Sequence, residues 1–289
     1  MPSIHEIAQN IDNAMASERH THLEAMYKHT GRNVICYYSG FLTSQKAGGI
    51  SIDDNDLHGI MSTVHKLNKK IGLDLILHTP GGDATATESI VSYLRSIFGD
   101  DIRAIVPHMA MSAGTMLACS CKEIIMAKHS SLGPIDPQYG GIPALDIVEE
   151  FESAKNDLST NPEQALYWKI LLEKYPVAFL GKCNKAIQLS EDLVKTWLSQ
   201  NMLKGQSKSK INGVLKVLNE NKKSKTHSRH FDTDKCKAAG LNIVDLEADP
   251  DFQDIVLSIH HCYMHFFMKS KCVKIIENHI GIAVVVEQK

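Results

Sequence analysis

The stretch LDLILHTPGG, residues 73–82, decides the fold class when it is read with the segment that follows it. LDLILH is apolar enough to form a buried strand, and the Pro-Gly-Gly sequence behind it ends that strand. An amphipathic helical pattern then runs to Gly99, and IRAIV at 102–106 forms a second strand. A strand, a crossover helix and a strand within about 35 residues predict a βαβ unit with parallel strands. The expected fold class is therefore α/β.

The same alternation of strands and helices extends to both sides of this unit. The further elements that the pattern predicts are strands at 33–38, 123–127 and 241–247, helices at 57–67, 112–121 and 252–268, and a last hairpin that turns at Asn278-His279. We divide the chain into an N-terminal helical arm (1–32), a core (33–247) that carries a helical insertion at about 143–220, and a C-terminal helix and hairpin (248–289).

Composition narrows the class of protein. The 289 residues are 43% hydrophobic and 22% charged with net charge −2, which excludes disorder, collagen and disulfide-stabilised miniproteins. The seven cysteines form no C-x-x-C pair, so reduced thiols in a cytoplasmic protein are expected. Glu6 and Asp12 are incompatible with an export signal. The uncharged run Ala104–Cys121 contains Pro107 and Gly114 and predicts a strand, a turn and a helix rather than a membrane span.

One segment is strongly basic. Between Lys204 and Arg229 the sequence has eight Lys or Arg residues and a single acid, Glu220. Because no aromatic residues are interleaved with these charges, we expect a solvated loop near the site and no nucleic-acid partner.

Two strand-to-helix junctions carry residues that suit acyl transfer. In Thr79-Pro80-Gly81-Gly82 the adjacent glycines leave backbone N–H groups uncovered, and such groups bind anions. In Ala110-Met111-Ser112-Ala113-Gly114 a serine stands between a strand end and a helix start, as in a nucleophile elbow. If the two strands are parallel neighbours, both junctions lie at one edge of the sheet. Ser112 then faces Gly81 and Gly82, and these glycines together with Ala113 supply oxyanion donors. The structural alternative is a serine that caps a helix beside an ordinary turn.

Three segments in order carry a resemblance to a known family. HTPGG (78–82), AMSAGTMLA (110–118) and HSSLGPIDPQ (129–138) resemble the serine dehydrogenase proteinase family, soluble relatives of signal peptide peptidase A in the Clp protease and crotonase fold. The similarity covers residues 33–200 and continues more loosely to 247. It implies a spiral of ββα units and a serine peptidase without cofactor or metal, with Ser112 as nucleophile and the glycines as oxyanion loop.

The resemblance also implies partners and an ATP-independent mode of action. The expected substrates are peptides or unfolded polypeptide segments, with membrane proteins left open as targets, and the expected assembly is a homo-oligomer. Two other classes stay open. A crotonase-like acyl-CoA enzyme uses the same sheet and oxyanion amides without a serine nucleophile, and a catalytically silent scaffold needs neither.

The general base is less well defined than the nucleophile. Relatives of signal peptide peptidase A use a lysine, and Lys155 follows Ser112 by 43 residues on a predicted helix. A lysine acts as a base only where burial favours its neutral form. His129 and His108 are the histidine alternatives, and Asp136 between two prolines is expected to shape a turn.

Metal and redox chemistry find little support in the sequence. His261 and His265 have the i, i+4 spacing of two ligands on one helix face, but the glutamate of a metalloprotease helix is missing between them. Cys119 and Cys121 follow Ser112 on a buried helix and are expected to be small core residues.

Overall fold

The central element is a mixed sheet whose strands come from the whole length of the chain. The computed structural model describes residues 4–43, 48–219 and 229–288. In these residues seven strands pair in the order β11-β10-β1-β2-β3-β5-β9. Their bounds are β1 (Asn33–Ser39), β2 (Leu73–His78), β3 (Ile102–Val106), β5 (Glu123–Met126), β9 (Ile243–Asp245), β10 (Cys272–Asn278) and β11 (Ala283–Glu287). The strands β1, β2, β3, β5 and β9 are parallel, as the βαβ pattern predicts.

The C-terminal hairpin completes this sheet at one side. β10 pairs antiparallel with β1, and β11 pairs antiparallel with β10. The turn between them contains Asn278 and His279, where it is expected. The predicted strand at 241–247 is shorter than expected, because only Ile243–Asp245 pairs with β5.

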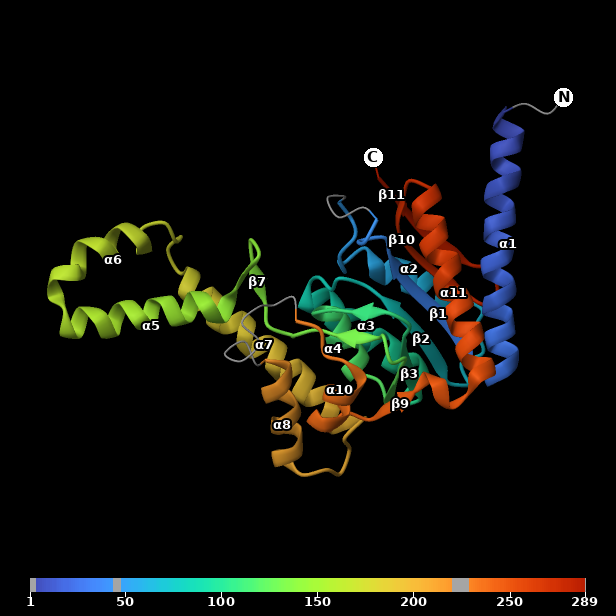
Figure 1. Cartoon of the computed structure of the whole chain (residues 1–289). Coiled ribbons are helices and arrows are strands. Elements are labelled where there is room, and N and C mark those ends of the chain that lie inside the picture. Colours follow the sequence, from blue (N-terminus) through green and yellow to red (C-terminus); the bar gives the residue numbers. More distant parts are fainter. Residues whose placement is uncertain (1–3, 44–47, 220–228, 289) are drawn as a thin grey trace.

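Helices cover both faces of the sheet (Figure 1). The α-helices of the described residues, including two that do not cover the sheet, are α1 (Ile4–Thr30), α2 (Asp56–Val64), α3 (Ala84–Phe98), α4 (Ala113–Cys119), α5 (Ala144–Thr160), α6 (Ala165–Leu172), α7 (Phe179–Gln200), α8 (Lys208–Leu218), α10 (Thr233–Ala239) and α11 (Pro250–Lys269). Because side chains alternate along a strand, Leu75 and Leu77 of β2 join the apolar cluster under α2, α3, α4 and α7, whereas Ile76 joins the cluster under α1 and α11.

Two small sheets lie outside the main one. β4 (Met109–Ala110) pairs in parallel with β6 (Ser131–Leu132), and β7 (Gln138–Tyr139) forms a hairpin with β8 (Ile142–Pro143). β4 starts three residues after β3 ends, so the chain turns out of the main sheet before it enters α4. This turn places the segment around Ser112 above the edge where the parallel strands end.

The predicted helical insertion forms a projecting arm. α5 and α6 extend away from the sheet, and α7 leads back to it (Figure 1). Several large apolar side chains on this arm are exposed, among them Leu166, Tyr167, Ile170 and Val177. The buried part of α7, which contains Val194 and Leu198, packs in the main core. We call residues 144–178 the arm from here on.

The basic segment is in part a folded helix, so the expectation of a solvated loop is wrong for that part. α8 buries Ile211, Val214 and Leu218 against the core, while its basic residues lie on the other side. Apolar residues three and four positions apart provide this buried face. Residues 220–228 of the basic segment lie outside the described residues.

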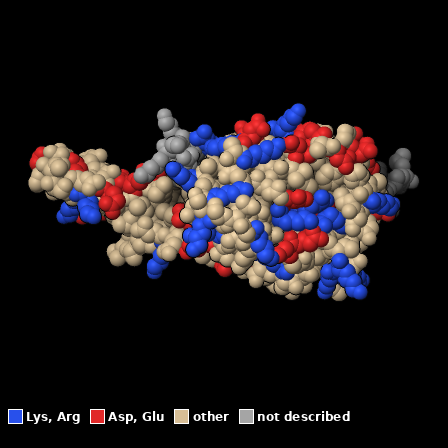
Figure 2. Space-filling model, turned by 90° about the horizontal axis from the view of Figure 1, so that it is seen from below, with Lys and Arg blue, Asp and Glu red and all other residues tan. Residues whose placement is uncertain are grey.

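Charges of both signs are mixed on the molecular surface. On the face seen in Figure 2, Lys and Arg side chains lie between Asp and Glu side chains. A charged network also lies beneath the surface: the Asp74 carboxylate is fully buried and accepts hydrogen bonds from the guanidinium groups of Arg32 and Arg103, each at 2.7 Å. No helix among the described residues is long and apolar enough to cross a membrane.

A second buried ion pair fixes the loop that precedes α2. The Lys274 side chain on β10 is 2% exposed; its Nζ lies 2.6 Å from Asp56 Oδ1 and donates to the Ser51 carbonyl oxygen at 2.8 Å. The Tyr37 hydroxyl donates to the same carboxylate at 2.7 Å. Burial and the neighbouring Asp56 raise the pKa of Tyr37 well above its usual value, so this phenol stays protonated. The network ties β1 and β10 to the Ser51–Ile52 segment.

Lys274→Met should destabilise the protein strongly. The substitution leaves the Asp56 carboxylate buried without its cation, which typically costs about 3–5 kcal/mol. Urea unfolding followed by tryptophan fluorescence measures the loss. Lys271→Met, which removes an exposed lysine three residues earlier, is the control and should change the unfolding free energy by less than about 0.5 kcal/mol. Equal unfolding midpoints for the two variants would contradict this account of Lys274.

Candidate active site

The two junctions singled out in the sequence lie side by side. The Thr79 N–H donates to the Met109 carbonyl oxygen at 3.1 Å, and the Met111 N–H donates to the Thr79 carbonyl oxygen at 3.0 Å. Thr79 also forms a parallel bridge with Ala110. We call residues 79–83 the glycine loop and residues 109–112 the serine loop. The bonds between the two loops arise because β2 and β3 are parallel neighbours that end at the same edge.

Gly81 allows the loops to come this close. A Cβ atom at Gly81 would lie 2.5 Å from the Met111 carbonyl oxygen and 2.7 Å from Ser112 Cβ, which no side chain tolerates. Its φ of +96° is also a conformation that favours glycine. Gly114 is needed for a similar reason, because a Cβ there would lie 2.5 Å from the Thr79 methyl group.

Ser112 has a backbone conformation that serine rarely adopts. Its φ is +50° and its ψ is −117°, and its hydroxyl makes no capping hydrogen bond at the start of α4. A residue held in such a region costs about 1–3 kcal/mol and persists only where its surroundings enforce it. The ordinary helix-cap interpretation of this serine therefore does not apply. Strain at a serine between a strand and a helix is the geometry of a nucleophile elbow.

The backbone donors around Ser112 differ in availability. The Gly81 N–H is already engaged, because it donates to Thr79 Oγ1 at 3.1 Å. The amides of Gly82 and Ala113 have no recorded acceptor among the described residues. The structure thus brings Ser112 together with the three residues expected as donors, but only the N–H groups of Gly82 and Ala113 are without an acceptor among the described residues.

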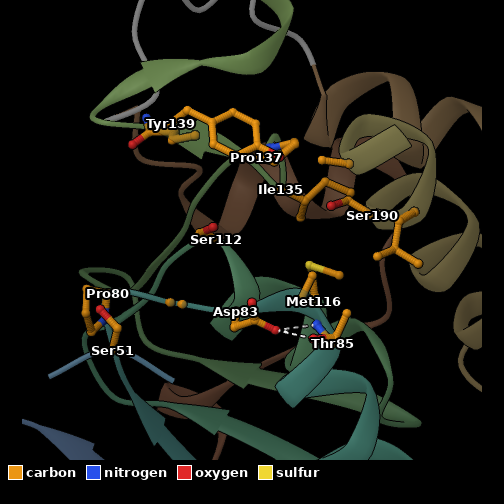
Figure 3. Close-up of a pocket in the computed structure, with 16 residues that line it drawn as sticks. Ser51, Pro80, Asp83, Thr85, Ser112, Met116, Ile135, Pro137, Tyr139 and Ser190 are labelled. Carbon is orange, nitrogen blue, oxygen red and sulfur yellow. Dashed lines mark hydrogen bonds between the residues drawn. The ribbon is translucent and has the colours of Figure 1, made fainter. Parts of the chain in front are cut away.

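A cavity of about 380 Å³ opens beside Ser112. In Figure 3, Ser112 lies between Pro80 on one side and Pro137 on the other. The lining comes from the segment before α2, the glycine loop, the start of α3, the serine loop, α4, β7 with the residues before it, and α7. It consists of Ser51, Pro80, Gly81, Gly82, Asp83, Ala84, Thr85, Ser112, Met116, Ile135, Pro137, Gln138, Tyr139, Ala186, Leu189 and Ser190. It mixes small, apolar and hydroxyl side chains with the carboxylate of Asp83, and no Lys or Arg among the described residues lines it.

Two polar side chains hold the walls of this cavity. Thr115 is fully buried: its hydroxyl donates to the Ala110 carbonyl oxygen at 2.8 Å and accepts from the Gly133 N–H at 2.9 Å, which joins the serine loop to the segment that carries Ile135. Asp83 caps α3 by accepting from the N–H groups of Thr85 and Ala86. A hydrogen bond from the Thr85 hydroxyl, together with these amides, lowers the pKa of Asp83.

The structure does not bring Lys155 to Ser112 within one chain. Lys155 lies on α5 in the arm, its side chain is 77% exposed, and its Nζ is 3.8 Å from Glu152 Oε2. It does not line the described cavity, and neither does any other lysine or any histidine among the described residues. The apolar positions Ile147 and Ala154 of α5 are buried as expected, but Lys155 is exposed to solvent.

The histidine alternatives and Asp136 also lie outside the lining of the cavity. His129 is exposed beyond β5, and His108 packs against other histidines. Asp136 is 4% exposed. His261 and His265 are both exposed on α11, and no group of three His, Cys, Asp or Glu side chains in the described part of the chain is arranged to hold a metal ion.

Sequence reasoning missed the segment that supports the glycine loop. The Ile52 N–H donates to the Gly81 carbonyl oxygen at 2.8 Å, and the Asp83 N–H donates to the Ile52 carbonyl oxygen at 2.9 Å. Lys274 in turn holds Ser51. A lysine inside the apolar strand CVKIIEN is the sequence signal that points to such a buried partner. It does not say which acidic residue the partner is.

Comparisons with known proteins agree with this geometry. A family model described as ClpP-like SDH-type serine proteinase matches residues 40–276. An uncharacterized protein of Methanocaldococcus jannaschii is 32% identical over 194 residues, which are 67% of this chain and 60% of that protein. A second one from the same organism is 39% identical over 102 residues, 35% of this chain and 34% of that protein. The chain thus spans less than two thirds of the length of these relatives.

A solved structure of a ClpP1 mutant from Listeria monocytogenes is also similar, with 13% identity and a TM-score of 0.41 over 76% of this chain and 94% of that one. The family match alone covers most of the chain, and it confirms the expected Clp protease and crotonase-like α/β fold. Because the family model matches residues 40–276, a range that includes the glycine loop and Ser112, the chain belongs to the family of ClpP-like SDH-type serine proteinases.

Proposed function

We propose that this chain is an ATP-independent serine peptidase whose nucleophile is Ser112. The strained backbone of Ser112 carries the proposal, because the residue neither caps its helix nor relaxes to an ordinary conformation. It lines a cavity together with Gly82, whose N–H has no acceptor among the described residues, and it directly precedes Ala113, whose N–H has none either. The membership of the family supports the same reaction class.

The proposed reaction proceeds through an acyl-enzyme. Ser112 Oγ attacks the peptide carbonyl carbon while its proton passes to a base, and the carbonyl oxygen becomes an oxyanion that accepts from the amides of Gly82 and Ala113. The C–N bond then breaks as the base returns the proton to the leaving amine. Water then attacks the ester carbonyl carbon and loses a proton to the same base. The base passes this proton to Ser112 Oγ as the ester C–O bond breaks, which releases the acid and restores the serine. Gly81 contributes the close approach of the two loops rather than a donor.

The base is proposed to be Lys155, presented by a neighbouring copy of the chain. Lys155 lies outside the cavity of its own chain, on an arm with exposed apolar side chains. Docking this arm on a second copy would bury Leu166, Tyr167 and Ile170 and would remove water from the lysine. The expected homo-oligomer thus serves the site as well as the apolar surface.

The acyl-CoA alternative is less consistent with this cavity. Coenzyme A carries several phosphate charges, which proteins usually bind with Lys or Arg. The described lining contains neither residue. A scaffold without catalysis offers no reason for strain at Ser112.

Ser112→Ala should abolish hydrolysis. A peptide mixture from a denatured protein is incubated with each variant, and the products are identified by mass spectrometry. Loss of the nucleophile is expected to lower kcat by at least about 10³-fold, because nucleophile and base act as a unit. Ser89→Ala on the exposed side of α3 is the control and should cleave normally. Equal cleavage by the Ser112 and Ser89 variants would exclude the proposed nucleophile.

Gly81→Ala should inactivate the enzyme without unfolding it. The new methyl group pushes the glycine loop away from Ser112, so kcat/KM is expected to fall at least about 100-fold as oxyanion binding is lost. Gly99→Ala is a matched control, because Gly99 also has positive φ but has open space around it. Both variants carry the backbone penalty, and only Gly81→Ala should lose activity. Comparable activity in the two would show that the contact with Ser112 is unimportant.

Activity should return when two inactive variants assemble together. Ser112→Ala and Lys155→Ala chains, each expected to be inactive alone, are co-expressed with different tags, and the mixed oligomer is purified. Random assembly pairs an intact serine with an intact neighbouring lysine in about a quarter of sites, which sets the expected activity. An inactive mixture would place the lysine in the same chain as its serine, and full activity of Lys155→Ala alone would exclude it as the base.

A further inference from the structure

Three histidines from three separate elements contact one another beside the glycine and serine loops. The ring centroids of His78 and His108 are 5.5 Å apart, those of His78 and His260 5.2 Å, and those of His108 and His260 5.7 Å. His78 ends β2, His108 lies between β3 and β4, and His260 belongs to α11. We call these three residues the histidine cluster.

Two members of the cluster are directly adjacent in sequence to the glycine and serine loops. His78 directly precedes Thr79, and His108 directly precedes Met109. Thr79 and Met109 are the residues whose backbone hydrogen bond, 3.1 Å long, joins the glycine loop to the serine loop. A displacement of either ring away from the other therefore pulls on the bond that brings Gly81 to Ser112.

The surroundings of the cluster favour neutral imidazole rings over charged ones. His78 has no exposed surface, and neither of its ring nitrogens has a hydrogen-bond partner of good geometry among the described residues. Tyr38 and Phe41 lie against the same ring, with centroid distances of 5.5 and 4.9 Å. A charged imidazolium needs two acceptors for its two N–H groups, and this apolar and aromatic surrounding does not provide them.

The titratable groups that face the cluster do not favour its charged form. Burial, followed by His260 and His108, lowers the pKa of His78 well below its usual value, and the backbone of Met109 opposes this only in part. Burial lowers the pKa of His260 to about 3, with contributions from His108, His261 and His129. Burial, His129 and His230 lower the pKa of His108, the least buried member. The hydroxyl of Tyr38 on β1 shares one hydrogen bond of 3.3 Å with His260 Nδ1. Burial raises the pKa of Tyr38, so this hydroxyl stays protonated.

We propose that the histidine cluster positions the glycine loop against the serine loop only while all three rings are neutral, so that protonation separates the loops and disassembles the site. The inference rests on the proposed function only in identifying these loops as the active site. His78, His108 and His260 are positioning residues, because none of them lines the cavity.

The direction of the pH effect follows from linkage. A histidine whose pKa is lower in the folded than in the unfolded chain binds its proton more readily when the chain is unfolded. Its contribution to the free energy of folding is therefore complete above the unfolded pKa of about 6.5 and is lost as the pH falls below that value. His108 is the first member expected to take up a proton, because it is only half buried. The loops should therefore be joined at pH 7 and should separate as the pH falls below the ordinary histidine value of about 6.5.

Amide hydrogen exchange tests this without any need for activity. Protection factors, corrected for the intrinsic effect of pH, are measured at pH 7 and pH 5 on peptides that span 79–83 and 109–114. For the wild type we expect protection to fall at least about ten-fold at pH 5, while β5 stays protected. In His108→Phe, which keeps an aromatic ring but cannot be charged, the fall should be less than about three-fold. His265→Gln, an exposed histidine on the same helix as His260, should behave as the wild type.

Two results would overturn the proposal. One is unchanged protection of both loops in the wild type at pH 5, and the other is an equal fall in the wild type and His108→Phe. If His108→Phe does not fold, NMR titration of the histidine rings in the wild type tests the proposal instead. Three neutral cluster rings at pH 7 would support it, and a charged cluster ring at pH 7 would contradict it. The exchange experiment gives the same answer in Ser112→Ala, so a failure of the peptidase assay and a failure of the histidine cluster remain distinguishable.

Discussion

The candidate site depends on one pair of backbone hydrogen bonds, those that Thr79 exchanges with Met109 and Met111. These bonds extend the pairing of β2 and β3 beyond the strands into the two loops. They force Gly81 into contact with Ser112, and that contact excludes any side chain at Gly81. Every feature that suits acyl transfer, from the free amides to the cavity, requires the two loops to stay together.

The strain at Ser112 is supported by what surrounds it. Thr115 joins the serine loop to the Gly133 segment by buried hydrogen bonds, and Gly114 lets α4 pack against the Thr79 methyl group. On the other side, Ile52 binds the backbone of the glycine loop, and Lys274 holds its neighbour Ser51. A local penalty of about 1–3 kcal/mol is offset by these distributed contacts, which is how functional sites keep strained residues.

The arm and the cavity present complementary features. The cavity has a strained serine beside the glycine loop but no lysine or histidine in its described lining, whereas the arm has an exposed lysine and exposed apolar side chains. Exposed apolar surface of this kind is typical of sites that bind another protein. The homo-oligomer proposed above, in which the arm of one copy docks at the cavity of the next, would account for both features with a single contact.

The sequence by itself determined the α/β class, most strands and helices, and the two junctions around Gly81 and Ser112, because these depend on local apolar periodicity and on turn residues close together in the chain. The amphipathic pattern of 208–218 was also present in the sequence, but the surrounding positive charge masked it. Only the tertiary structure decided the position of Lys155 and the partners of Lys274 and His78. Those partners lie on strands and helices that are distant in sequence, and they meet because the order of strands in the sheet, which no local pattern encodes, brings them together.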